Sequence, residues 1–168
     1  FLLKNKMEKY KIIENFLPSP ELIKLQNIFN STQIDWYYIK DINKQVSKDA
    51  LGVYFVHTAY EEGKASKFMH LFSSLLVRLD MKALVRIKVN LYPRTPKLET
   101  HTKHKDYNFP HTGAIFYLNT NNGKTILEDG TQISSIANRI LLFDASTPHS
   151  STSTTDSKVR VNINLNYE

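Results

Sequence analysis

Three alternating stretches in the second half of the chain constrain the fold more than any other feature. In residues 84–92 (LVRIKVNLY), 112–119 (TGAIFYLN) and 158–166 (KVRVNINLN), apolar and polar residues alternate. Alternation with a period of two gathers the apolar side chains on one face of a β-strand, and that face has to be buried. Asn-Gly and Asp-Gly pairs in 119–125 and 128–131 are typical of tight hairpin turns. We therefore expect an antiparallel barrel or a double-sheet jelly roll.

The first half of the chain predicts helices. Apolar residues at helical spacing indicate a helix over 19–29, with Ser19 as its N-cap. A second helix is expected from about residue 65 to residue 80. Two segments rich in aromatic residues, 36–40 and 51–57, are predicted to be strands or extended loops.

Length and composition indicate one globular domain. The chain has 168 residues, of which 41% are hydrophobic and 23% charged, an ordinary balance for a soluble protein. No repeat or linker divides it, so we expect residues 1–82 to support a β-sheet core formed by residues 83–168 in a single domain. No apolar run is long enough for a membrane span, and no secretory signal is visible, so a cytoplasmic location is expected. The net charge of +6 comes from scattered lysines, which favours solubility over a nucleic-acid surface.

Absence of cysteine restricts any transition-metal site to histidine and carboxylate ligands. His104 and Asp106 are two residues apart, so on an extended chain their side chains point the same way. His149 follows a proline near the end of a predicted strand and is the candidate third ligand. Two histidines and one carboxylate form the facial triad typical of non-haem Fe(II) oxygenases, which leaves adjacent coordination positions open. His101 and His111 flank the motif and are the alternative ligands if the register differs.

A cation in the last predicted strand adds a second element to the site. Arg160 shares a strand face with Asn162 and Asn164, opposite the apolar face. This polar face either lines a cavity or meets solvent. A buried arginine is costly unless an anion meets it, and its guanidinium fits a carboxylate with two hydrogen bonds. A dicarboxylate held at a metal by one end would present its other end to such an arginine.

Taken in order, His104, Asp106, His149 and Arg160 resemble the 2-oxoglutarate and Fe(II)-dependent oxygenases. The resemblance covers about residues 85–168, and the surrounding text is similar to small prolyl-hydroxylase-like members of that superfamily. It implies a double-stranded β-helix core, a variant of the jelly roll, packed against N-terminal α-helices. It also implies Fe(II) as metal, 2-oxoglutarate as cosubstrate, O2 as oxidant, and ascorbate as a supporting reductant.

The same resemblance suggests further contacts with the cosubstrate. Asn90 and Tyr92 are similar to an Asn-x-Tyr pair of the AlkB-type demethylases, in which both side chains touch the cosubstrate. Arg160 and Asn162 resemble the Arg-x-Asn found there. We therefore expect Arg160, Tyr92, Asn90 and Asn162 to bind 2-oxoglutarate, with Tyr92 donating its hydroxyl to a carboxylate.

The reaction implied is hydroxylation of a C–H bond with release of succinate and CO2. A protein or peptide prolyl side chain is the favoured substrate, a small molecule remains open, and loops at 41–64 and 93–101 are expected to set specificity. One alternative is an AlkB-like nucleic-acid demethylase, in which the aromatic residues of the 36–40 segment would stack on bases. The other is a non-oxidative cupin-type metal-binding protein, which would not need Arg160.

Overall fold

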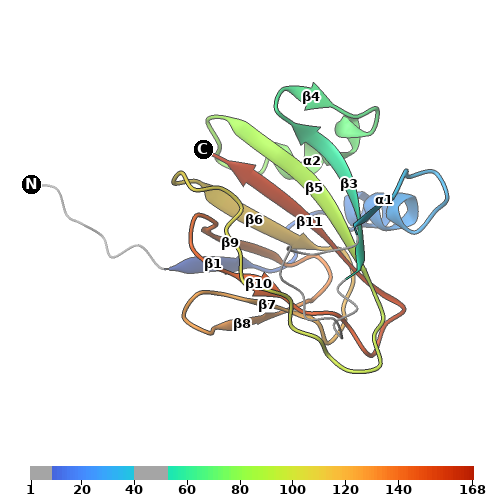
Figure 1. Ribbon diagram of the computed structural model, residues 1–168. Coiled ribbons are helices and arrows are strands. Elements are labelled where there is room, and N and C mark those ends of the chain that lie inside the picture. Colours follow the sequence, from blue (N-terminus) through green and yellow to red (C-terminus); the bar gives the residue numbers. More distant parts are fainter. Residues whose placement is uncertain (1–8, 40–52) are drawn as a thin grey trace, which may run out of the picture.

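The computed structural model describes residues 9–39 and 53–168, which are mainly β (Figure 1). Its helical elements are α1 (Ser19–Phe29), the 3-10 turn η1 (Met69–Phe72) and α2 (Ser73–Leu76). The strands are β1 (Tyr10–Ile13), β2 (Tyr37–Ile39), β3 (Tyr54–Glu61), β4 (Lys64–Ala65), β5 (Leu84–Pro93), β6 (Thr112–Tyr117), β7 (Lys124–Ile126), β8 (Gln132–Ser134), β9 (Ile140–Asp144), β10 (Ser150–Ser151) and β11 (Val159–Tyr167).

The strands form two antiparallel sheets. The large sheet has eight strands in the order β1-β9-β6-β11-β5-β3-β2, with β4 paired to β3, and the small sheet has the order β10-β7-β8. The chain therefore alternates between sheets: β6 and β9 belong to the large one, β7 and β8, between them in sequence, to the small one. This alternation is the jelly-roll connectivity that the sequence predicts.

Two hydrophobic clusters cover the two faces of the large sheet. On the outer face, α1, η1 and α2 pack against β5, β6 and β11, and this main cluster includes Phe29, Phe72, Val89 and Ile163. On the inner face, the small sheet packs against β6 and β9 through a smaller cluster. Figure 1 shows the small sheet and the helices on opposite sides of the large sheet.

The strand expectations are confirmed, because their period is a local property that burial of one face enforces. Segments 84–92, 112–119 and 158–166 become β5, β6 and β11, which pair side by side at the centre of the large sheet. Residues 128–131 lie in the tight turn between β7 and β8. Segment 119–125 does not form a hairpin, because it carries the chain from the large sheet to the small one.

The helix expectations are confirmed only in part. Helix α1 has the bounds expected, but Ser19 is its first residue and Pro18 its N-cap, without a side-chain capping hydrogen bond. The helix expected over 65–80 is wrong: its first residue, Ala65, belongs to β4, which pairs with β3, and only η1 and α2 are helical. None of the described helices is long and apolar enough to span a membrane.

The aromatic segments 36–40 and 51–57 contribute strands β2 and β3 at one edge of the large sheet. Residues 40–52, which include half of the first expected specificity loop, lie outside the described residues. Trp36 packs against Phe29 in the main cluster, with ring centroids 6.1 Å apart. Tyr37 and Tyr38 are exposed by contrast.

Candidate metal centre

Backbone pairing brings the two histidines of the candidate triad together. The His104 N–H donates to the His149 carbonyl at 2.8 Å, and the His149 N–H donates to the His104 carbonyl at 2.9 Å. Two residues further on, the Asp106 N–H donates to the Ala145 carbonyl at 3.1 Å. Segments 45 residues apart in sequence are thereby fixed side by side, and the i, i+2 spacing puts Asp106 on the same side as His104.

The ligand atoms of His104, Asp106 and His149 all lie within 4.8 Å of one another. Each histidine presents Nε2 to a different oxygen of Asp106, at 3.8 Å from His104 to Oδ1 and 3.9 Å from His149 to Oδ2. Because metal–nitrogen and metal–oxygen bonds are about 2 Å long, ligand atoms in adjacent coordination positions lie about 3 Å apart, so the three side chains would close by about 1 Å around an ion.

The histidine rings are oriented by main-chain carbonyls. Nδ1 of His104 is 3.3 Å from the Thr102 carbonyl, and Nδ1 of His149 is 3.0 Å from the Thr147 carbonyl. A carbonyl only accepts, so each Nδ1 carries the proton and each Nε2 keeps its lone pair toward Asp106. Burial lowers the pKa of His104, and the neighbouring His149 lowers it further. His104 is therefore held in the neutral, metal-binding form.

Asp106 is the charge at the centre of the site, and its side chain is only 3% exposed. Burial would raise the pKa of this carboxyl, but the Arg86 guanidinium, His149 and two amide donors outweigh it and bring the pKa to about 2. Arg86 Nη2 lies 3.0 Å from Oδ1, while Asn166 and Asn164 donate to Oδ2 at 2.8 and 3.2 Å. The carboxylate is thus ionised and fixed in place without a metal.

Arg160 is the largest fully buried side chain of the described residues. Its guanidinium donates to the Ser135 hydroxyl at 2.9 Å, the Thr152 carbonyl at 3.2 Å and the Thr125 hydroxyl at 3.3 Å. All three acceptors are neutral, and no carboxylate within 9–39 or 53–168 lies within 4.0 Å of it. Burial lowers the pKa of Arg160, as expected for a cation without an anionic partner.

Two tyrosines flank this cation. The guanidinium carbon lies 5.2 Å from the Tyr92 ring centroid and 6.0 Å from that of Tyr117. Tyr92 is the residue expected from the sequence. Tyr117, whose hydroxyl donates to Thr125 at 2.8 Å, was missed. Strand parity was the available signal, because Tyr117 pairs with Asn162 and therefore shares its face.

The polar face of β11 lines the interior, which settles the alternative left open by the sequence. Arg160, Asn162, Asn164 and Asn166 follow one another on this face and are all buried. Asn90 on β5 pairs with Asn162 in register and donates to its side-chain oxygen at 3.0 Å. One strand face thus runs from the buried cation at one end to the amides that hold Asp106 at the other.

The two alternative histidines lie outside the triad. His101 is 2.7 Å from the Ser151 hydroxyl through Nδ1 and stacks on Tyr92 with ring centroids 5.1 Å apart. Burial lowers the pKa of His101 to about 4, helped by the positive charge of Arg160. His111 faces the Phe109 carbonyl at 2.8 Å and packs against the ring of Tyr107.

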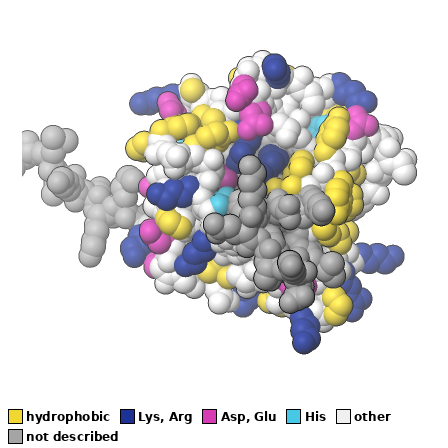
Figure 2. All heavy atoms as spheres, viewed as in Figure 1, with side chains coloured by type: hydrophobic (Ala, Val, Ile, Leu, Met, Phe, Trp, Pro, Cys, Tyr) yellow, Lys and Arg dark blue, Asp and Glu magenta, His cyan; other side chains and the backbone are white. Residues whose placement is uncertain are grey.

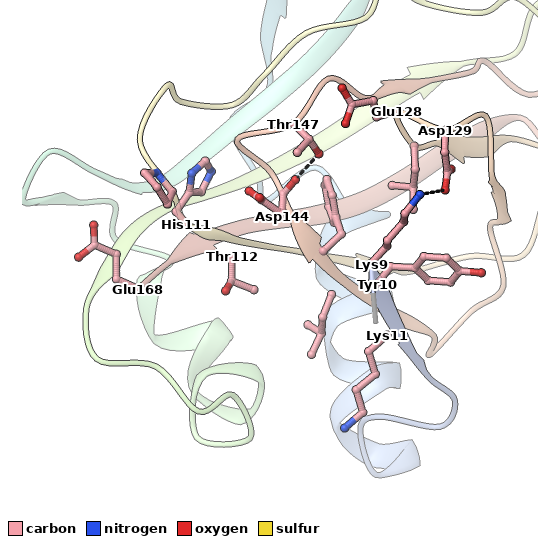
Figure 3. A pocket seen from close by; sticks show the side chains of 14 residues that line it. Lys9, Tyr10, Lys11, His111, Thr112, Glu128, Asp129, Asp144, Thr147 and Glu168 are labelled. Atoms are coloured by element: carbon pink, nitrogen blue, oxygen red, sulfur yellow. Dashed lines mark hydrogen bonds and ion pairs between the residues drawn. The ribbon is translucent and has the colours of Figure 1, made fainter. Parts of the chain in front are cut away.

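A cavity of about 960 Å³ lies beside the triad and is distinct from it (Figure 3). His111, Thr112 and Glu168 line one side, and Lys9 and Asp129 form an ion pair on the other. None of the triad residues lines it. Phe143 forms part of its wall and packs edge-on against His149, with centroids 4.9 Å apart.

On the face seen in Figure 2, basic, acidic and histidine side chains gather near the middle of the molecule.

Neither the models of protein families nor the curated proteins contain a match to this sequence. Solved structures do resemble the fold. A prolyl-4-hydroxylase from Pseudomonas putida has a TM-score of 0.61 and 13% identity, with 96% of this chain and 94% of that one covered. A prolyl hydroxylase from Trichoplax adhaerens, in complex with a hypoxia inducible factor peptide fragment, has a TM-score of 0.65 and 18% identity, covering 96% and 84%.

A third structure, an oxidoreductase of the 2OG-Fe(II) oxygenase family from Burkholderia pseudomallei, has a TM-score of 0.68 and 9% identity, covering 95% and 85%. Likeness of this kind extends over nearly the whole chain, including the N-terminal helices. At such low identities it bears on the fold alone. The chain has the jelly-roll fold of these prolyl hydroxylase and 2OG-Fe(II) oxygenase structures.

Proposed function

We propose that the protein is an Fe(II)- and 2-oxoglutarate-dependent dioxygenase that hydroxylates a C–H bond and releases succinate and CO2. The observation that carries this proposal is the pairing of two features across one strand face. A compact His-Asp-His triad stands at one end, and a fully buried arginine with no carboxylate partner among residues 9–39 and 53–168 stands at the other.

The triad fits Fe(II) by the chemistry of its donors. His104 and His149 offer neutral imidazole nitrogens, and Asp106 offers an ionised oxygen, a set that suits iron and leaves coordination positions for other ligands. Arg86, Asn164 and Asn166 hold the carboxylate in position before metal arrives. A preformed site of this kind loses little orientational freedom when the ion binds.

The buried cation fits the distal carboxylate of 2-oxoglutarate. Arg160 can place its guanidinium against two oxygens, and the hydroxyl of Tyr92 can donate to the same group. Asn90 and Asn162 lie between Arg160 and the triad on the inner face, where the middle of a five-carbon diacid would pass. The side-chain oxygen of Asn90 is buried without a donor among the described residues, so it is available to the ligand.

When bound, iron and 2-oxoglutarate supply the oxidising chemistry with O2. The chain's own residues bind and orient these groups and exclude water. Packing of the small sheet over β6 and β9 closes the inner face beside Arg160, which strengthens the arginine–carboxylate attraction because the local dielectric is low. The described residues need not transfer a proton in this scheme.

For the substrate, we infer a protein or peptide side chain, with proline as the favoured residue. The support is the likeness to two prolyl hydroxylases, one of them solved with a peptide fragment. Of the three aromatic residues on which the nucleic-acid alternative depends, Trp36 packs in the main cluster and is not free to stack on bases, whereas Tyr37 and Tyr38 are exposed. A cupin-type binding protein would leave the burial of Arg160 without explanation.

The test begins with anaerobic protein, Fe(II) and 2-oxoglutarate. The metal-to-ligand absorption band of the ternary complex should appear with one iron per chain, and under air succinate should form. His149→Ala should abolish stoichiometric iron binding, because one of three ligands is lost. His70→Ala is the matched control, since His70 is exposed and remote from the triad.

Two results would refute the assignment. If iron binding survived His149→Ala and vanished with His101→Ala, the third ligand would be His101 and not His149. Stoichiometric iron binding with neither the absorption band nor succinate would support a metal protein that does not use 2-oxoglutarate.

A further inference from the structure

Lys88 is a cation on the inner face of β5 that has no part in the metal and cosubstrate sites described above. Its side chain lies between those of Arg86 and Asn90 on the same strand face, because side chains alternate along a strand. In register it stands opposite Thr58 of β3 and Asn164 of β11. Asn164 donates to Asp106, so Lys88 is one strand away from the amides that hold the metal carboxylate.

Nearby acids are already engaged with another cation. Arg86 lies 3.0 Å from Asp106 and 3.7 Å from Glu61, and Glu61 also accepts from the Tyr107 hydroxyl at 3.1 Å. Lys88 forms neither an ion pair nor a side-chain hydrogen bond with any other residue of 9–39 and 53–168. Its ammonium lies over the face of the Tyr54 ring, 6.0 Å from Nζ to the centroid.

Burial acts on the same ammonium. Lys88 is partly buried, and burial lowers its pKa to about 8, with the Arg86 cation acting in the same direction. Placing an ammonium in such surroundings without an acidic partner, as among the described residues, is unfavourable for the free protein. An arrangement of this kind is stabilised when a ligand brings the missing negative charge.

Lys88 lies several residues along β5 from Tyr92, which flanks the proposed cosubstrate anchor Arg160. Tyr92, which flanks Arg160, is four residues further along β5, or about 13 Å at about 3.3 Å per residue. A five-carbon diacid held by Arg160 and reaching toward the metal is shorter than this. Lys88 therefore stands at the triad end of this face, opposite Asn164 and beyond the carboxylate that Arg160 would hold.

The net charge of the loaded site also favours an anionic ligand at Lys88. With Fe(II) and 2-oxoglutarate bound, the two charges of the ion and the two of the diacid cancel. The charged side chains around the site are then Arg86, Lys88 and Arg160 against Asp106 and Glu61. One positive charge remains, and it matches a single carboxylate better than a doubly charged phosphate.

On the basis of the proposed function, we propose that Lys88 binds a carboxylate of the substrate close to the C–H bond that is oxidised. The carboxylate belongs either to a small acid or to a peptide, as an acidic side chain or a C-terminus. Lys88 is then a specificity residue: it selects acids over the corresponding amides and does not take part in holding iron or 2-oxoglutarate.

The experiment compares acids with their amides on the iron- and 2-oxoglutarate-loaded enzyme. The probes are L-proline with L-prolinamide, N-acetyl-L-proline with its amide, and proline peptides carrying Glu or Gln beside the proline. Succinate release and perturbation of the anaerobic absorption band report the response to each. The free acids and the peptides distinguish a small-molecule source of the carboxylate from a peptide one.

In the parent protein, acids should be preferred over amides by about tenfold to a hundredfold in apparent affinity, as expected for a hydrogen bond to a charged group. Lys88→Gln should remove this preference, and Lys88→Arg should retain part of it. Both variants should bind iron and 2-oxoglutarate like the parent, which shows that the fold and the proposed function are intact.

Two outcomes would overturn the proposal. Equal responses to acids and amides in the parent protein, at any level, would show that no anion is selected. A loss of 2-oxoglutarate affinity of tenfold or more in Lys88→Gln would assign the ammonium to the cosubstrate instead. If the parent itself does not bind 2-oxoglutarate, it is the proposed function that fails, and the absorption band reports this before any acid is added.

Discussion

Replacing Arg160 with methionine should separate the stability of the free protein from its affinity for 2-oxoglutarate. Methionine fills a similar apolar volume but removes the charge and the planar donor fork. Arg160 is fully buried, and its three hydrogen bonds all go to neutral groups. The free protein therefore bears the desolvation cost of a cation without the attraction of an anion.

The effect on the free protein should be small. Three hydrogen bonds are lost, each with a net contribution of about 1 kcal/mol, but an unpaired buried charge is removed at the same time. We expect the free energy of unfolding to change by no more than about 1 kcal/mol. For a chain of this size that corresponds to a Tm shift of about 2–4 °C.

The effect on the cosubstrate should be large. Truncating one partner of a buried charge pair costs about 2–5 kcal/mol, which is on the order of thirtyfold to several-thousandfold in affinity. A ligand at one hundred times its Kd stabilises the parent protein by about 2.7 kcal/mol, or about 5–11 °C in Tm. Arg160→Met should lose this ligand-induced increase at the same concentration of 2-oxoglutarate.

Thermal unfolding of the iron-loaded protein under nitrogen, with and without 2-oxoglutarate, measures both effects in one experiment. Arg160→Lys is the matched control: it keeps the charge, loses the fork, and should weaken binding less than methionine does. A methionine variant that is stabilised by 2-oxoglutarate as much as the parent would refute the anchor, and Arg86 or Arg94 would be the next candidates.

Two further predictions concern the same face of the large sheet. In metal-free protein, the pKa of the Asp106 carboxyl is depressed from 3.8 to about 2, so the stability it contributes is present above pH 4 and lost as the pH falls toward 2. That loss is about 2 kcal/mol at about 1.4 kcal/mol per pH unit. Urea unfolding at a series of pH values measures it, and Asp106→Asn should abolish this part of the decrease in stability between pH 4 and pH 2. A decrease of the same size in the variant would contradict the assignment. Gly123→Ala should weaken 2-oxoglutarate binding without affecting iron, because a Cβ at this position would overlap Arg160 Cδ and crowd the Ser153 carbonyl. The same overlap should lower stability by about 1–3 kcal/mol, and unchanged calorimetric affinity for 2-oxoglutarate would show that Arg160 is not the anchor.

Local periodicity explains which parts of the fold could be predicted from the sequence. Strands β5, β6 and β11 were predictable because a period of two is enforced wherever one face is buried. The helix expected over 65–80 was not, because tertiary contacts override helical spacing there. Gly63 adopts a positive φ of 76° in a turn that pairs β4 with β3, and the Ser66 hydroxyl accepts the Phe68 N–H. Within 65–80, helical structure begins only after this turn, in η1 and α2.

The neighbours of the candidate site depend on how two sheets pack, which no local pattern records. Arg160 could be predicted because it stands on the polar face of a strand. Its partners Thr125, Ser135 and Thr152 come from three separate segments, and their approach depends on the position of the small sheet. The ion pair of Arg86 with Asp106 was likewise missed, because it joins β5 to a loop whose course is fixed only by the backbone pairing of His104 with His149.

Strand β11 explains why a few sequence positions nevertheless predict so much of the candidate site. Its apolar side chains, Val161, Ile163 and Leu165, are buried in the main cluster. Its polar side chains point to the opposite face. Arg160 is the buried cation there, and Asn164 and Asn166 donate to Asp106. A register shift of one residue would exchange the two faces, burying amides in the hydrophobic cluster and removing the candidate site in the same step. The requirement to bury the apolar face therefore also fixes the direction of Arg160, so the fold and the proposed cosubstrate anchor depend on the same register.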